Sequence, residues 1–85
     1  MTDKEDSDRL RAIQQENRRL AYLRFRVDLS LREIRGGHYT LNQSHQVVEK
    51  VRSQALKLFP GQEATFDLIY LPRFKRAITE TFNLH

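Results

Sequence analysis

Two pairs of polar side chains have the four-residue spacing that a metal site or an acid–base pair on one helix requires. His45 and Glu49 are four residues apart, as are Glu63 and Asp67, so each pair would share one helix face. A metal site needs three or four converging ligands, and the chain has no cysteine to complete one. Glu63 and Asp67 could do acid–base chemistry, but their place near the start of an expected helix better suits carboxylates that stabilise its dipole.

Other catalytic patterns are absent from the 85-residue sequence. It contains no glycine-rich phosphate loop and no nucleophile elbow, and its serines, among them Ser30, Ser44 and Ser53, stand in no recognisable motif. We therefore expect no catalytic residue, no cofactor, no metal and no small-molecule substrate. The sequence predicts that the protein is not an enzyme.

Arginine interleaved with aromatic residues is the best functional signal. The chain has 15 Lys and Arg against 11 Asp and Glu, a net charge of +4. Residues 1–8 hold one Lys and four acids, which gives −3, whereas residues 9–35 hold eight Arg and three acids, which gives +5. Arg binds carboxylates and phosphates in bidentate fashion and stacks on rings. Acidic proteins and nucleic acids are therefore the two classes of partner to consider.

On a helix, many of these arginines would lie opposite an apolar seam, with Tyr22, Phe25 and Leu29 among them. A second basic cluster follows Pro72. The alternative is that the apolar residues pack beneath other helices while arginine stems surround them. The predicted partner-binding residues are Arg18, Arg19, Tyr22, Phe25, Arg26, Arg73, Lys75 and Arg76.

These features favour a non-catalytic protein-interaction or regulatory module that presents an arginine and aromatic face to an acidic protein. The alternative is a nucleic-acid-binding protein that uses the same face. The net charge is modest, and no helix-turn-helix, zinc-finger or RNA-binding pattern is present. The sequence therefore leans toward a protein partner.

A single long helix over residues 3–35 would carry that face, with residues 1–8 frayed and Gly36-Gly37 as its stop. Apolar residues recur in heptads along it. Such a helix is about 45 Å long, which two shorter helices cannot cover. We therefore predict a homodimer in which Asn17 faces Asn17 of the second copy. Its interface would consist of Leu10, Ile13, Asn17, Leu20 and Arg24.

Two shorter helices are expected after the stop. Residues 41–59 follow a capping box that runs from Thr40 to Gln43, and Pro60-Gly61 ends them. Residues 63–83 form the last helix, kinked or broken at Pro72. The predicted fold is an all-α single domain over residues 1–85. The predicted core is Leu20, Leu23, Val27, Leu31, Ile34, Val48, Val51, Leu58, Phe66, Ile69, Tyr70, Phe74 and Ile78.

A β-containing alternative comes from two short segments. Apolar and polar residues alternate strictly over 23–31, which is typical of a strand, and 65–71 could also be extended. If both were strands, the fold would be an N-terminal helix followed by βαβα. Leu and Arg are good helix formers, so the helix is preferred over 23–31.

The N-terminus is acidic and has no apolar signal segment, and no apolar run approaches the length of a membrane span. We expect a cytoplasmic protein of a bacterium or phage that does not bind membranes.

Overall fold

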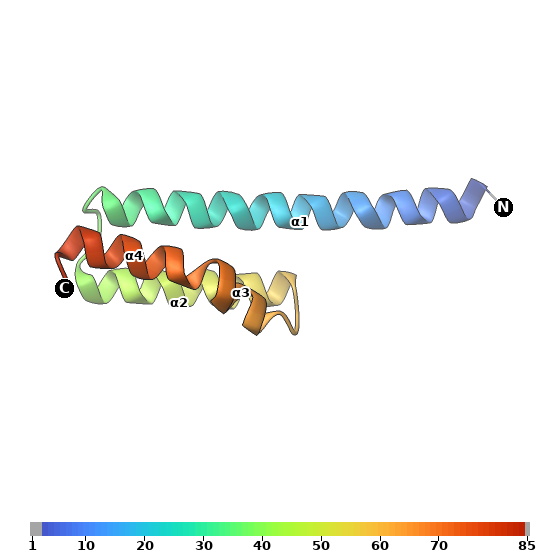
Figure 1. The fold of residues 1–85 in the computed structure, drawn as a ribbon. Coiled ribbons are helices and arrows are strands. Elements are labelled where there is room, and N and C mark those ends of the chain that lie inside the picture. The colour runs from blue at the N-terminus through green and yellow to red at the C-terminus, as the bar shows by residue number, and fades with distance from the viewer. Residues whose placement is uncertain (1–2, 85) are drawn as a thin grey trace.

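The computed structural model describes residues 3–84, and all its regular elements there are helices. They are α1 (Asp3–Arg35), α2 (Leu41–Leu58), α3 (Glu63–Ile69) and α4 (Leu71–Phe82). The long α1 forms one layer, and α2, α3 and α4 lie along one half of it (Figure 1). The all-α prediction is confirmed. The βαβα alternative is wrong over residues 3–84, because both ambiguous segments are helical.

The last predicted helix consists of two helices that meet at Tyr70. The Tyr70 N–H donates to the Phe66 carbonyl at 2.9 Å, and the Tyr70 carbonyl accepts from Arg73 and Phe74 at 3.1 and 3.2 Å. Pro72 lies in the first turn of α4. Backbone N–H groups in the first turn have no carbonyl partner within their own helix, so the missing N–H of proline costs α4 no hydrogen bond. The chain therefore bends at this point while its backbone stays hydrogen-bonded.

The glycine pair ends α1 as expected. The His38 N–H donates to the Glu33 carbonyl at 3.1 Å and the Gly37 N–H to the Ile34 carbonyl at 3.2 Å, which is the Schellman pattern. Gly37 has φ of 78°, a conformation that glycine adopts without steric cost. This turn sends α2 back along α1.

The predicted capping box begins α2. The Gln43 N–H donates to Thr40 Oγ1 at 3.2 Å, and the Gln43 side-chain oxygen accepts from the Thr40 N–H at 2.9 Å. Both contacts satisfy backbone donors that the helix itself leaves unpaired.

One face of each helix contributes to a single core. The prediction of Ile69 as a core residue is wrong, because its side chain is 51% exposed. Leu20, Leu58 and Tyr70 are only half-buried. The buried apolar residues are Leu23, Val27, Leu31, Ile34, Val48, Val51, Ala55, Phe66, Phe74, Ala77 and Ile78.

The N-terminal half of α1 projects beyond the other helices (Figure 1). At 1.5 Å per residue, the 33 residues of α1 span about 50 Å, whereas the 18 residues of α2 span about 27 Å. The molecule accordingly measures 58 × 23 × 16 Å. We call the projecting part, residues 5–19, the overhang.

Candidate interaction surfaces on the first helix

The outward side of α1 carries the predicted arginine and aromatic residues. Tyr22 is 49% exposed and Phe25 is 57% exposed, so neither packs beneath another helix. Leu29, which follows them toward the C-terminal end of α1, is half-buried. Exposed arginines lie before and after these residues along the helix. We call this surface the arginine face, and it consists of Arg11, Arg18, Tyr22, Phe25, Leu29 and Arg32.

The arginine face has few internal countercharges. Arg18 and Arg32 are exposed, and neither forms an ion pair among the residues that the structure describes. Two rings and unpaired guanidinium groups on one surface are the residue types enriched in protein interfaces. The face is therefore open to a partner that brings negative charge and apolar groups.

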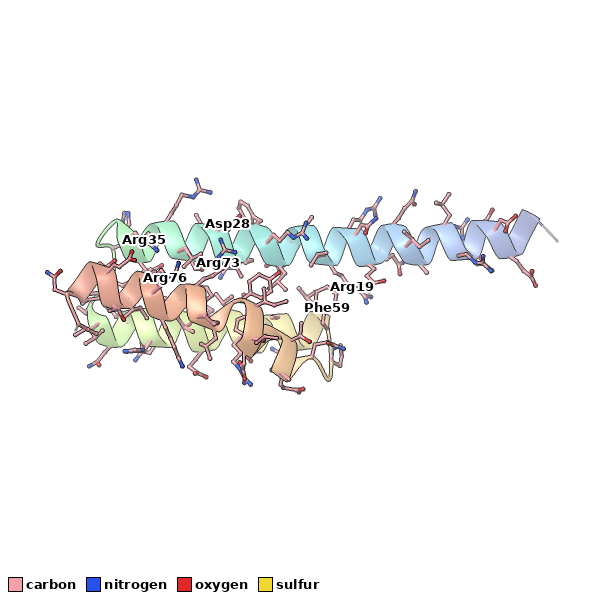
Figure 2. All side chains as sticks on the ribbon, in the orientation of Figure 1. Arg19, Asp28, Arg35, Phe59, Arg73 and Arg76 are labelled. Atoms are coloured by element: carbon pink, nitrogen blue, oxygen red, sulfur yellow. The ribbon has the colours of Figure 1, made fainter. Side chains whose placement is uncertain are left out.

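Arg19 and Arg26 follow the edge of α1, seven residues apart. Arg26 is half-buried, and its Nε–H donates to Oε1 of Gln54 on α2 at 3.3 Å. Arg19 is exposed at the level where Phe59 follows α2 (Figure 2). Arg26 thus helps to hold α2, whereas Arg19 is available to a partner.

The second basic cluster divides between two sides of α4. Arg73 reaches Asp28 of α1, with 3.5 Å between Nη2 and Oδ1, and Arg76 follows on the same edge of the helix. Figure 2 shows both beside α1, where Arg35 pairs with Glu80 at 2.6 Å. Lys75 instead borders a hollow with His45 and Glu49. Lys75 is therefore not part of a single surface with Arg73 and Arg76.

Three of the five predicted dimer-interface residues lie on the overhang. Leu10 is 56% exposed and Ile13 is 49% exposed, and Asn17 is exposed on the same heptad seam. Leu20, one turn on, is half-buried. We call Leu10, Ile13, Asn17 and Leu20 the seam stripe. Of the remaining seam positions, Arg24 is exposed, whereas Val27, Leu31 and Ile34 are buried under the protein's own helices.

An apolar groove opens where the overhang meets the end of the helical pair. Its volume is about 510 Å³. The α1 wall consists of Glu16, Leu20, Leu23 and Arg24. Phe59, Ile69 and Tyr70 are among the residues opposite. Sequence reasoning missed this groove, because it arises from the bend at Tyr70. The seam stripe leads directly into it through Leu20.

An ion pair fixes the far wall of the groove. Arg52 of α2 donates through Nε and Nη2 to both carboxylate oxygens of Asp67 on α3, at 2.8 and 3.1 Å. This bidentate contact lowers the pKa of Asp67 from its ordinary value, and the nearby charges of Arg52 and Lys75 act in the same direction. The ion pair between Arg52 and Asp67 therefore holds α3 in a fixed orientation against α2.

Another hydrogen bond supports the turn after α1. Tyr39 donates its hydroxyl proton to a carboxylate oxygen of Glu33. This bond, burial and the Glu33 charge all raise the pKa of Tyr39. The contact ties the α1–α2 connection to the last turns of α1.

The histidine and carboxylate pairs gain no further ligands. Among the described residues, no three His, Asp or Glu side chains lie close enough to hold a metal ion. The prediction that the protein is not an enzyme stays a prediction. No helix within residues 3–84 combines the length and the apolar character needed to cross a membrane.

Comparison with known proteins gives no family or fold relative. The chain matches no protein-family model, and no curated protein and no solved structure matches it either. Its function must therefore be argued from the two surfaces of α1.

Proposed function

We propose that this chain is a non-catalytic interaction module that self-associates through α1 and presents the arginine face to an acidic partner protein. The observation that carries the proposal is the exposure of Tyr22 and Phe25 among arginines that form no ion pair within the described structure. A chain of 85 residues has few large apolar side chains to place in its core. Two aromatic rings left in water are consistent with a surface that is covered in use.

An acidic, partly apolar protein surface matches this face. Guanidinium groups form bidentate hydrogen bonds with carboxylates, and Tyr and Phe supply apolar contact area. From Arg11 to Arg32 the face extends for about 32 Å, the length of a six-turn helix. The proposed partner therefore offers an acidic helix or strand with apolar residues along one side.

Nucleic acid is the second candidate, because the same cations would bind phosphates and the same rings would stack on bases. Two observations favour protein over nucleic acid. Glu5, Asp6 and Asp8 are exposed on the helix that carries the face, and Arg73 is paired with the carboxylate of Asp28. Both reduce the positive potential available to a polyanion.

Binding to two probes tests the proposal. Fluorescence anisotropy would compare a labelled amphipathic peptide of alternating Glu and Leu with 30-nucleotide single-stranded and double-stranded DNA and RNA, each at 50 and 200 mM salt. We expect binding of the peptide and weak nucleic-acid binding. Sub-micromolar nucleic-acid binding that falls steeply with salt would favour the second candidate instead.

Matched variants assign the binding to the arginine face. Arg18→Gln with Arg32→Gln removes two exposed charges from the arginine face, and Lys50→Gln with Lys57→Gln removes two exposed charges from α2. We expect the first variant to lose most of the peptide binding and the second to keep it. Phe25→Ser, compared with Leu68→Ser on α3, tests the aromatic contribution in the same way.

A further inference from the structure

The overhang has an apolar stripe, an acidic end and an open groove beside it. Leu10 and Ile13 are about half exposed, and the groove at Leu20 and Arg24 is lined by exposed Ile69 and half-buried Phe59. Burial of such apolar surface is favourable by roughly 25 cal/mol per Å². The overhang and the groove are two unpartnered parts of one continuous surface.

The charge along α1 is strongly asymmetric. Glu5, Asp6 and Asp8 lie at its start, and Arg24 lies on the seam about five turns after Asp6. Two copies in parallel would place acidic end against acidic end and arginine against arginine. Two copies in antiparallel orientation would place the acidic end of each copy beside Arg24 of the other copy. Like charges placed opposite one another oppose association, and unlike charges favour it.

We infer that two copies of the chain pair antiparallel along their overhangs, and that the N-terminal turns of each α1 cover the groove of the other. This inference rests on the self-association in the proposed function and adds its geometry. It departs from the in-register pairing of Asn17 with Asn17, which the heptad pattern alone suggested. The helical pairs then lie at opposite ends of the dimer.

One register uses both the stripe and the groove. When Leu10 of one copy lies beside Leu20 of the other, Ile13 lies beside Asn17, and Asp6 reaches Arg24. Arg24 occupies a seam position and lines the groove, so it needs a negative charge when a second helix covers it. The other charged residue of the α1 wall, Glu16, lies beside Gln14 of the other copy, so it does not face a second carboxylate. This register leaves the arginine face of both copies exposed.

Orientation is measured directly by distances between spin labels. The chain has no cysteine, so Arg32→Cys provides one labelling site per copy. In the antiparallel register the two sites are separated by 34 residues of helix, or about 50 Å. In a parallel pair they would lie at the same level, within about 30 Å of each other. Sedimentation equilibrium of the unlabelled full chain at tens of micromolar gives the oligomeric state, which we expect to be a dimer.

Charge exchange tests the register. Asp6→Lys alone and Arg24→Glu alone should each weaken the dimer about tenfold, because each places like charges together at two symmetric contacts. The two substitutions in one chain should restore the affinity. Asp8→Lys makes the same charge change on the side of α1 away from the seam and should leave the affinity within about twofold. Circular dichroism of each variant checks that α1 remains helical.

The possible failures have different meanings. A monomer at tens of micromolar would overturn both the antiparallel pairing and the self-association, but peptide binding to the arginine face would still be tested separately. A dimer with the short spin-label distance would overturn the orientation alone. A double variant that does not recover would overturn the contact between Asp6 and Arg24.

Discussion

Arg52 and Asp67 form the one bidentate ion pair among the described residues, and the pair joins α2 to the short helix α3. A seven-residue helix is too short to be stable alone in water. The orientation of α3 therefore depends on Phe66, which is buried in the core, and on this ion pair.

Replacement of Asp67 should lower stability in a pH-dependent way. Folding lowers the pKa of Asp67 below its ordinary 3.8, so the pair stabilises the protein above that pH and ceases to do so as the pH falls through the folded-state pKa. We expect Asp67→Asn to unfold at a lower temperature than the natural chain at pH 7, with the difference shrinking as the pH falls below 3.8. Thermal unfolding followed by circular dichroism at several pH values measures this.

Glu63→Gln is the matched control for Asp67→Asn, because it removes one carboxylate from an exposed position on the same helix. Its effect at pH 7 should be smaller. Equal effects of the two substitutions would mean that net charge, and not the contact with Arg52, explains the loss.

Ser44 should be a site where a smaller side chain stabilises the fold. Its side chain is fully buried, and Oγ has no hydrogen-bond partner in the described structure. An unpaired buried hydroxyl costs about 1–3 kcal/mol. We expect Ser44→Ala to raise the free energy of unfolding by about 1 kcal/mol, measured by urea denaturation. Ser53→Ala, exposed on the same helix, controls for helix propensity and should have less effect. A destabilised Ser44→Ala would show that the hydroxyl is hydrogen-bonded in solution.

The turn after α1 should depend on glycine at position 37. With φ of 78°, Gly37 has open space around it, so an added side chain would meet a conformational cost and no steric clash with distant atoms. Gly37→Ala should lower the free energy of unfolding by about 1–2 kcal/mol. Gly37→Asn should cost less, because Asn tolerates the left-handed conformation. Equal costs for Ala and Asn would argue that the backbone conformation at this turn is different.

Local sequence signals were sufficient for the helices of this fold. Gly36-Gly37, the capping box from Thr40 to Gln43 and Pro60-Gly61 each set a helix boundary through backbone hydrogen bonding or its loss, so their effect does not depend on distant residues. The length of α1 relative to α2 also implied an exposed overhang. The exposure of Leu10 and Ile13 agrees with that expectation.

Tertiary relationships could not be read in the same way. Ile69 fits the apolar spacing of the last segment, but the break at Tyr70 turns α3 so that Phe66 enters the core and Ile69 faces the groove. Along their own helices, Asp28 is four residues from Arg32 and Glu49 is three residues from Arg52, spacings that allow ion pairs within a helix. The structure instead pairs Asp28 with Arg73 and Arg52 with Asp67 of other helices, because helix packing brings these groups within reach.

The alternating run over residues 23–31 permits a sharp test of helix packing. In a strand, Leu23 and Phe25 would share one face, whereas in α1 Leu23 is 5% exposed and Phe25 is 57% exposed. Leu23→Ala should therefore cost about 2–5 kcal/mol of unfolding free energy, a large part of what a domain of this size has. Phe25→Ala should change it by less than about 0.5 kcal/mol, because no cavity forms at an exposed site. Urea denaturation monitored at 222 nm compares the two directly. Similar losses for both variants would place Phe25 under another helix and remove it from the arginine face, whereas a loss confined to Leu23→Ala leaves the Phe25 ring free for a partner.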